Sequence, residues 1–218
     1  MVEGLVLTGV LTSVFWWLGE KHEDERASRA DKRALQQSLY FEDLEGLVMP
    51  AEDLSGLYFG RRDLNGADLH EADLSKTQAR WANLVESDLH LSDLRGADIR
   101  DADMRRANLS LANLAGAEVQ RADLRDAGMN GANLTDANLT GANLTNANLG
   151  SSDLSGSNLS DAVLTEANLT GSDLTGSKWG PGRDPTWPSG FDPPANGWIP
   201  GGDNCADRRA ALPLPLSP

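Results

Sequence analysis

The sequence has 218 residues, a formal net charge of -14 at pH 7 and only 6% aromatic residues. The negative charge argues against a nucleic-acid-binding surface over the whole body, and a single cysteine, Cys205, excludes an intrachain disulfide framework. A chain this poor in aromatic residues must build its core from small aliphatic side chains.

The first predicted element is the long uncharged apolar run from Gly4 to Gly19. As a helix it would be about 24 Å long, shorter than the ~30 Å hydrocarbon core of a bilayer, although flanking residues or local thinning could close the gap. We predict a membrane anchor over residues 1–19, and a soluble helix that caps the repeats is the alternative. A secretory signal peptide is not favoured, because no Lys or Arg precedes the run and no small-residue cleavage site follows it.

Basic residues follow this apolar run but none precedes it: Lys21, Arg26, Arg29, Lys32 and Arg33. If the run crosses a membrane, this bias predicts a single-pass protein with the rest of the chain on the cytoplasmic side; otherwise the protein is expected in the cytoplasm. Residues 20–39 contain no Gly or Pro and predict a charged helical spacer, in which Glu25 and Arg29 form an i,i+4 pair.

A five-residue period occupies residues 40–179. Its clearest stretch, Gly131 to Leu149, reads GANLTDANLTGANLTNANL. A period of five fits neither the helical turn nor the two-residue alternation of a strand, so the chain must turn a corner once per repeat and stack as a solenoid. With the central residue of each unit called i, the frame runs from Leu44 to Leu174 without an insertion.

Tandem A(D/N)LXX units of this kind resemble the pentapeptide-repeat family. The resemblance implies an all-β fold, a right-handed, four-sided parallel β-helix in which residues i and i−2 point inward and residues i−1, i+1 and i+2 point outward. Four units then make one coil, so each residue stacks on its equivalent four units later, as Leu94 would on Leu114. Asp, Asn and Gly are expected to supply the corner conformations.

The segment after the frame is rich in Pro, Gly and Trp. Its stretch from Thr186 to Pro193 resembles a segment that often follows the repeats in actinobacterial members of the family. Because a solenoid end exposes unpaired edges, residues 180–200 are predicted to cap the last coil. Residues 201–218 are predicted to be disordered. The aromatic residues assigned to this cap are Trp179, Trp187, Phe191 and Trp198.

No motif indicates catalysis, since the chain has no Gly-rich phosphate loop, HExxH, GxSxG or CxxC sequence. We therefore predict a non-enzymatic protein without a cofactor. His70 and His90 occupy equivalent positions four units apart and would stack, with Asp68 and Asp88 one position before the core leucines. A weak metal site is the alternative, but two histidines without a third nearby ligand of firm geometry favour a solvent-exposed row, so no metal ligand is predicted.

Much of the acidic charge follows from the repeat frame, because many aspartates occupy position i−1. Some members of the family resemble a DNA duplex in size and charge and occupy the DNA site of gyrase. A DNA-mimic inhibitor of a topoisomerase such as gyrase is therefore the alternative function. The units here are the regular Ala-Asx-Leu kind, without the Cys/Phe-rich units and loop insertions associated with gyrase-protecting members. Direct nucleic-acid binding is not expected.

One outward surface is rich in arginine although the chain as a whole is negatively charged. Trp81 would lie one coil from Arg61, in cation–π contact, and an exposed Trp with flanking Arg side chains is a frequent anchor for protein binding. Self-neutralising Arg–Asp rows are the alternative interpretation. We predict a scaffold or protein-interaction module with an unidentified protein partner, and a homo-oligomer remains open. We call its candidate surface the Arg–Trp patch: Arg61, Arg80, Trp81, Arg100, Arg105, Arg106 and Arg121.

Overall fold

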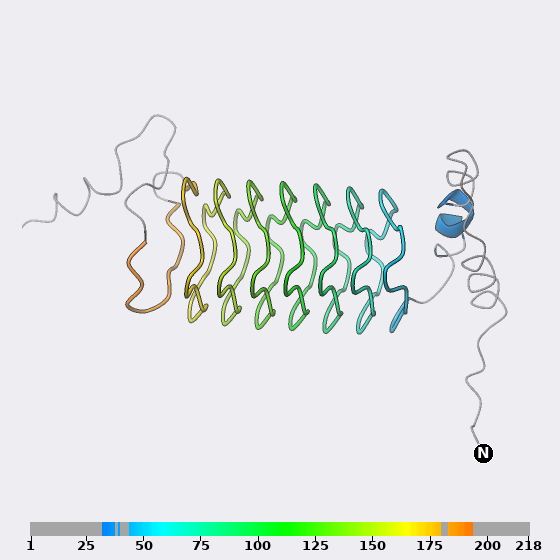
Figure 1. Cartoon of the computed structure of the whole chain (residues 1–218), viewed down its shortest axis with the longest axis horizontal. Coiled ribbons are helices and arrows are strands. Elements are labelled where there is room, and N and C mark those ends of the chain that lie inside the picture. Colours follow the sequence, from blue (N-terminus) through cyan, green and yellow to red (C-terminus); the bar gives the residue numbers. More distant parts are fainter. Residues whose placement is uncertain (1–31, 38, 40–43, 180–182, 194–218) are drawn as a thin grey trace, which may run out of the picture. The chain divides into compact units, whose positions relative to one another are not determined.

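The computed structural model describes residues 32–37, 39, 44–179 and 183–193 (Figure 1). The chain divides into two units, Met1–Asp43 and Leu44–Pro218. In the first unit, residues 32–37 and 39 are helical. Within the described part of the chain, no helix has both the length and the apolar character needed to cross a bilayer. The predicted anchor (1–19), Trp198 and the predicted disordered tail (201–218) all lie outside the described residues.

The second unit is a stack of coils in which the chain pairs in parallel with its own continuation (Figure 1). Residue i−1 of each unit forms a bridge with its equivalent four units later, as Asp53 does with Asp73. Bridges recur once in every unit, so each coil has four sides. The predicted stacking of Leu94 on Leu114 is confirmed, because the Leu94 N–H donates to the carbonyl of Asn113 at 2.7 Å.

The expected all-β character is only partly met. The bridges are isolated, and no extended strand forms within residues 44–179. The reason is that residues i+1 and i+2 of every unit form a turn, which leaves one residue per side to make a bridge. Backbone groups are nevertheless paired as in a sheet: the N–H groups of Leu54 and Gly56 donate to the carbonyls of Asp73 and Ser75, both at 2.8 Å.

The corners depend on left-handed backbone at position i+2. Every residue at this position, from Gly46 to Gly176, has φ between 55° and 72°. The expectation that Asp, Asn and Gly supply this conformation is wrong for many corners, since Trp81, Leu91 and Leu111 adopt it at φ 59°. The inter-coil hydrogen bond from the i+2 N–H, repeated around the coil, holds even bulky residues in a conformation that L-residues avoid.

The Asp and Asn residues at i−1 have a different local role. Their Oδ1 atom accepts a hydrogen bond from the backbone N–H of residue i+1, as from Ser55 to Asp53 at 3.1 Å and from Thr135 to Asn133 at 3.0 Å. This Asx-type contact supports the turn that follows the bridge. It explains why the sequence alternates freely between Asp and Asn at this position, because both offer the same acceptor.

The core consists of the i and i−2 residues, as predicted. Leu114, Ala112 and their equivalents in neighbouring coils are buried. Where Ser or Thr replaces Ala at i−2, its hydroxyl usually donates to the backbone carbonyl of residue i in the preceding unit, as Ser87 does to Leu84 at 2.8 Å. The beginning of the stack departs from the pattern, since Glu52 in the first coil and Arg62 at the start of the second occupy i−2 and are only half-buried.

The five-residue frame ends at Trp179, and a C-terminal segment continues the pairing with a different register. Thr186 bridges Val163, which the frame would have paired with Arg183, and the Thr186 carbonyl accepts a hydrogen bond from the N–H of Leu164 at 2.7 Å. The ring of Trp187 lies 5.4 Å from those of both Trp179 and Phe191, edge-on to the first and stacked on the second. These three of the four rings assigned to the cap are therefore in contact.

Candidate functional site

The Arg–Trp patch is centred on Trp81, whose side chain is 47% exposed at a corner of the coil. The guanidinium carbon of Arg61, at the same corner one coil earlier, lies 4.9 Å from the Trp81 ring centroid, as the spacing predicted. Arg80 makes a second and shorter contact at 4.3 Å. The indole is therefore held by two cations while half of it faces solvent.

Most other arginines of the patch are paired with carboxylates, as the alternative interpretation expected. Hydrogen bonds from Arg100, Arg121 and Arg105 hold the pKa values of the carboxyls of their aspartate partners below the usual range. Such half-exposed pairs leave little net charge with which to attract a partner. The closest distances are 2.5 Å for Arg100–Asp98 and 2.7 Å for Arg105–Asp103, Arg106–Glu86 and Arg121–Asp101.

The end of the patch around Trp81 is different. Within the described residues, Arg61 forms no ion pair, and Arg80 reaches Asp101 only at 3.4 Å. The Nε atom of Arg80 is buried and has no hydrogen-bond partner among the described residues. The charges at this end are therefore less fully neutralised than those around Arg100 and Arg121.

Sequence reasoning missed Tyr58, which lies on the same side of the coil as Arg61 and is 49% exposed. Its ring covers Gly60, where an added Cβ would come within 2.6 Å of the Tyr58 Cζ atom. The available signal was its position, because Tyr58 occupies i−1, where Asp or Asn is the rule. Tyr, Trp and Arg are the residue types most enriched at the energetic centres of protein interfaces.

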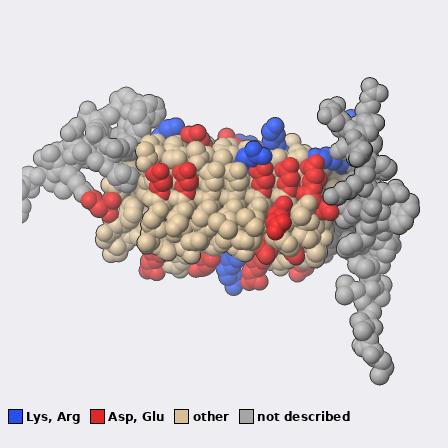
Figure 2. All heavy atoms as spheres, viewed as in Figure 1, with Lys and Arg blue, Asp and Glu red and all other residues tan. Residues whose placement is uncertain are grey.

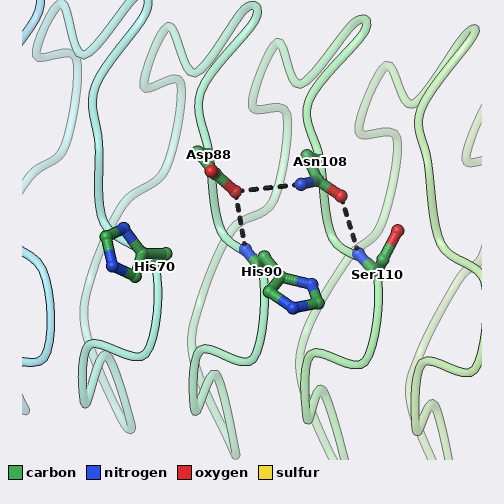
Figure 3. A pocket seen from close by; sticks show the side chains of 5 residues that line it. All are labelled: His70, Asp88, His90, Asn108 and Ser110. Carbon is green, nitrogen blue, oxygen red and sulfur yellow. Dashed lines mark hydrogen bonds between the residues drawn. The ribbon is translucent and has the colours of Figure 1, made fainter.

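The opposite side of the coil carries the two stacked histidines. His70 and His90 line an open pocket of about 490 Å³ together with Asp88, Asn108 and Ser110 (Figure 3). Asp88 Oδ1 accepts hydrogen bonds from the backbone N–H of His90 at 3.0 Å and from the side-chain amide of Asn108 at 3.0 Å. These contacts fix the Asp88 carboxylate at the pocket wall.

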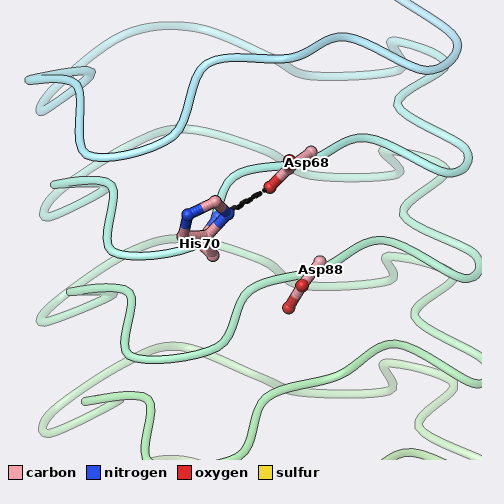
Figure 4. A group of neighbouring side chains, drawn as sticks. All are labelled: Asp68, His70 and Asp88. Carbon is pink, nitrogen blue, oxygen red and sulfur yellow. Dashed lines mark hydrogen bonds and ion pairs between the residues drawn. The ribbon is translucent and has the colours of Figure 1, made fainter.

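On this face, two aspartates lie close to His70, so the side chains form more than the predicted row of histidines. Asp68, His70 and Asp88 each offer one potential metal-ligand atom, and these atoms all lie within 4.8 Å of one another (Figure 4). His70 Nδ1 lies 2.5 Å from Asp68 Oδ1, and this hydrogen bond raises the pKa of His70. The two aspartates named beside the histidines in the sequence thus supply potential ligands close to His70, and Asp88 comes from the next coil.

The remaining acidic residues are spread over the repeats with basic side chains among them (Figure 2). Several aspartates at i−1 form an ion pair with an arginine two residues later, as in Asp93–Arg95 at 2.5 Å and Asp123–Arg125 at 2.6 Å. Paired carboxylates of this kind do not form an unbroken row of free negative charge. The DNA-mimic alternative stays a prediction.

Comparison with protein families identifies one match. The family described as "Pentapeptide repeats" matches in eight copies over overlapping segments, residues 53–90, 74–110, 92–131, 120–156 and 142–178. Together these segments extend over residues 53–178, more than half of the chain. No curated protein matches the sequence.

Several solved structures are similar to this chain. A pentapeptide repeat protein from the cyanobacterium Cyanothece is 35% identical over 44% of this chain and 63% of its own length, with a TM-score of 0.42. The chain thus spans less than two thirds of that protein. QnrB1, a plasmid-mediated fluoroquinolone resistance protein, is 21% identical over 62% of this chain and 84% of its own, with a TM-score of 0.38. HetL from Nostoc, a pentapeptide repeat protein involved in heterocyst differentiation regulation, is 26% identical over 66% of this chain and 90% of its own length, with a TM-score of 0.25.

Proposed function

Because the chain belongs to the pentapeptide repeat family, we propose that it is a non-enzymatic, right-handed solenoid that binds a protein partner through its Arg–Trp patch. The family supports a scaffold role in general terms, and the geometry of the patch supports this choice of surface. The observation that carries the proposal is the half-exposed Trp81 in contact with both Arg61 and Arg80.

The chemistry of this surface indicates the kind of partner it would accept. An indole in contact with two guanidinium groups and 47% exposed offers apolar surface beside positive charge, and Tyr58 adds a second exposed ring. A carboxylate on the partner could pair with Arg61, which has no ion pair among the described residues. We therefore propose an acidic segment of a protein that also carries an apolar side chain to pack against Trp81.

The experiment is affinity capture with the tagged full chain, quantified by mass spectrometry, comparing the wild type with Trp81→Ala and Arg61→Ala. The matched control is Leu111→Ala, which removes an equally exposed large side chain from a different side of the coil. We expect both patch variants to lose a shared partner that the control retains, with losses of about 2 kcal/mol or more if Trp81 is an energetic centre. An identical set of captured proteins in all four samples would contradict the proposal.

We propose further that residues 1–19 tether the protein to a membrane with the repeats on the cytoplasmic side. Support comes from the uncharged run between Gly4 and Gly19 and from the basic residues that follow it. Alkaline carbonate extraction of membranes from the native host tests this tether. Full-length protein is expected in the pellet, and its recovery in the supernatant would argue against an anchor.

A further inference from the structure

The side chains of Asp68, His70 and Asp88 converge although they come from two coils. Asp68 and His70 belong to the same unit, and the parallel bridge between Asp68 and Asp88 brings the third residue alongside. One ligand atom from each lies within 4.8 Å of the others (Figure 4). Asp68 and His70 bond to each other, and Asp88 is held by His90 and Asn108, so hydrogen bonds already orient all three side chains.

Asp68 and Asp88 are the i−1 aspartates of the described repeats that have a histidine two residues later. At four i−1 aspartates of the described repeats, an arginine two residues later pairs with the carboxylate: Asp93–Arg95, Asp98–Arg100, Asp103–Arg105 and Asp123–Arg125. At Asp53, Asp63 and Asp73 that position holds Ser or Asn. The stacked carboxylates of Asp68 and Asp88 therefore have imidazole nitrogens beside them, which can bind a metal ion, as guanidinium groups and serine side chains at the same position do not.

The ligand chemistry indicates which cation would fit. Two carboxylate oxygens and one imidazole nitrogen form a mixed set that suits a borderline divalent transition metal better than Mg²⁺ or Ca²⁺, which take oxygen ligands alone. His90 lines the same pocket and stands one coil beyond His70 (Figure 3). The pocket is open to solvent, which leaves space for a water molecule as a further ligand.

We propose that Asp68, His70 and Asp88 bind one divalent transition-metal ion of the Zn²⁺ class on the side of the coil opposite the Arg–Trp patch. Zinc–oxygen and zinc–nitrogen bonds of about 2.1 Å place tetrahedral ligand atoms roughly 3.4 Å apart. The widest separation in the group, which is at most 4.8 Å, must therefore shorten, while His70 Nδ1 and Asp68 Oδ1, now 2.5 Å apart, must give up their hydrogen bond and move apart. The His70 and Asp68 side chains are 39% and 38% exposed, so rotation about their side-chain bonds achieves this without moving the backbone.

The test is isothermal titration calorimetry of the purified full chain with ZnCl₂, comparing the wild type with His70→Ser and Asp88→Asn. Both substitutions already occur in this frame, because Ser110 and Asn108 occupy the same two columns one coil beyond His90 and Asp88. The matched control is Asp73→Asn, which changes an i−1 aspartate on a neighbouring side. Circular dichroism confirms that each variant is folded.

We expect one zinc ion per chain in the wild type and in the control, and an affinity weaker by roughly tenfold or more in His70→Ser and in Asp88→Asn. Mg²⁺ should not compete at equal concentration. The proposal is overturned if no heat of binding is seen, or if zinc binds equally well to the His70→Ser variant, which would place the ion elsewhere on the chain.

Proton competition gives a second readout. His70 faces Asp68, Asp88 and Glu71, all of which raise its pKa, and the proton on its imidazole must leave when the metal binds. The zinc affinity of the wild type should therefore rise as the pH increases through the pKa of His70. A pH-independent affinity in the same range would contradict the assignment of His70 as a ligand.

Discussion

Single residues at the corners carry conformational strain that the sequence pattern alone does not show. Seventeen corner residues other than glycine have φ values from 55° to 60°. A left-handed conformation costs roughly 1–2 kcal/mol for an ordinary L-residue. The fold tolerates this cost because the corner N–H group is hydrogen-bonded to the next coil, so the strain is distributed over many positions that the stack as a whole determines.

We predict that Gly66→Ala lowers the free energy of unfolding by about 1 kcal/mol. Gly66 has φ 65°, and an added Cβ would meet no atom within 4 Å, so the loss would come from the backbone and not from a clash. Gly66→Asn is the control and should cost less, because asparagine tolerates this region better. Urea unfolding of both variants measures the difference, and equal stability of the two would contradict the argument.

We also predict different losses of stability from two leucines that lie close together in the chain. Leu114 is completely buried in an unbroken column of leucines, whereas Leu111 is 51% exposed at a corner. Leu114→Ala should destabilise the protein by about 2–5 kcal/mol through the lost contacts and the cavity. Leu111→Ala should change stability by less than about 0.5 kcal/mol. Thermal unfolding followed by circular dichroism compares them, and similar losses would argue against the assigned inward and outward positions.

At the scale of elements, the C-terminal segment forms backbone hydrogen bonds with one side of the last coil. Residues 183–186 pair with residues 161–164, and Trp187 contacts both Trp179 and Phe191. An end without this cover would expose unpaired backbone groups and the buried face of the last coil. The segment therefore has a structural reason to leave the five-residue frame.

Truncation after Ser177 is predicted to cause concentration-dependent aggregation, because it removes this pairing and Trp179 together. Light scattering and size-exclusion chromatography measure the outcome. Truncation after Pro193 is the matched control, since it retains every described residue of the segment, and it should remain soluble. A monodisperse, folded protein ending at Ser177 would show that the last coil needs no cover.

Across the whole repeat unit, the two halves use different side chains for the same outward positions. In the first half, many i−1 aspartates pair with an arginine two residues later. In the second half, a Thr hydroxyl donates to the Asn two residues before it, as Thr140 does to Asn138 and Thr145 to Asn143, both at 2.7 Å. Both arrangements satisfy the same acceptor. Acid weakens only the Asp–Arg pairs, because a neutral Thr–Asn pair has no charge to lose.

Stability is therefore predicted to fall in acid. Hydrogen bonds from arginine lower the pKa values of Asp93, Asp98 and Asp103 in the folded state. Because the folded pKa lies below the unfolded value, this stabilisation is complete above the ordinary aspartate range and is lost as the pH falls through the folded pKa. Melting temperatures recorded from pH 7 to pH 2 measure the decline.

The control is the double variant Asp98→Asn, Arg100→Thr, which installs the neutral pair found at Asn138 and Thr140 in the same two columns. It should lose less stability than the wild type over the same pH range. An identical pH profile would show that this Asp–Arg pair does not contribute to the acid sensitivity.

The sequence by itself determined the repeat frame, the stacking of each unit on its equivalent in the next coil and the inward positions of the leucines and alanines. It could do so because a strictly periodic chain makes every vertical neighbour a fixed distance away in sequence, so that local pattern and tertiary contact coincide.

Only the tertiary structure decided which outward side chains meet. It showed that bulky residues take the left-handed corners, that most arginines of the Arg–Trp patch turn to nearby carboxylates, and that Tyr58 joins Trp81 as a half-exposed aromatic residue near Arg61. It also showed that His70 bonds to Asp68 and that ligand atoms of Asp68, His70 and Asp88 lie within 4.8 Å of one another. The repeat does not fix how surface side chains rotate. Several carboxylates lie within reach of each cation, and the distances between them decide which pair forms.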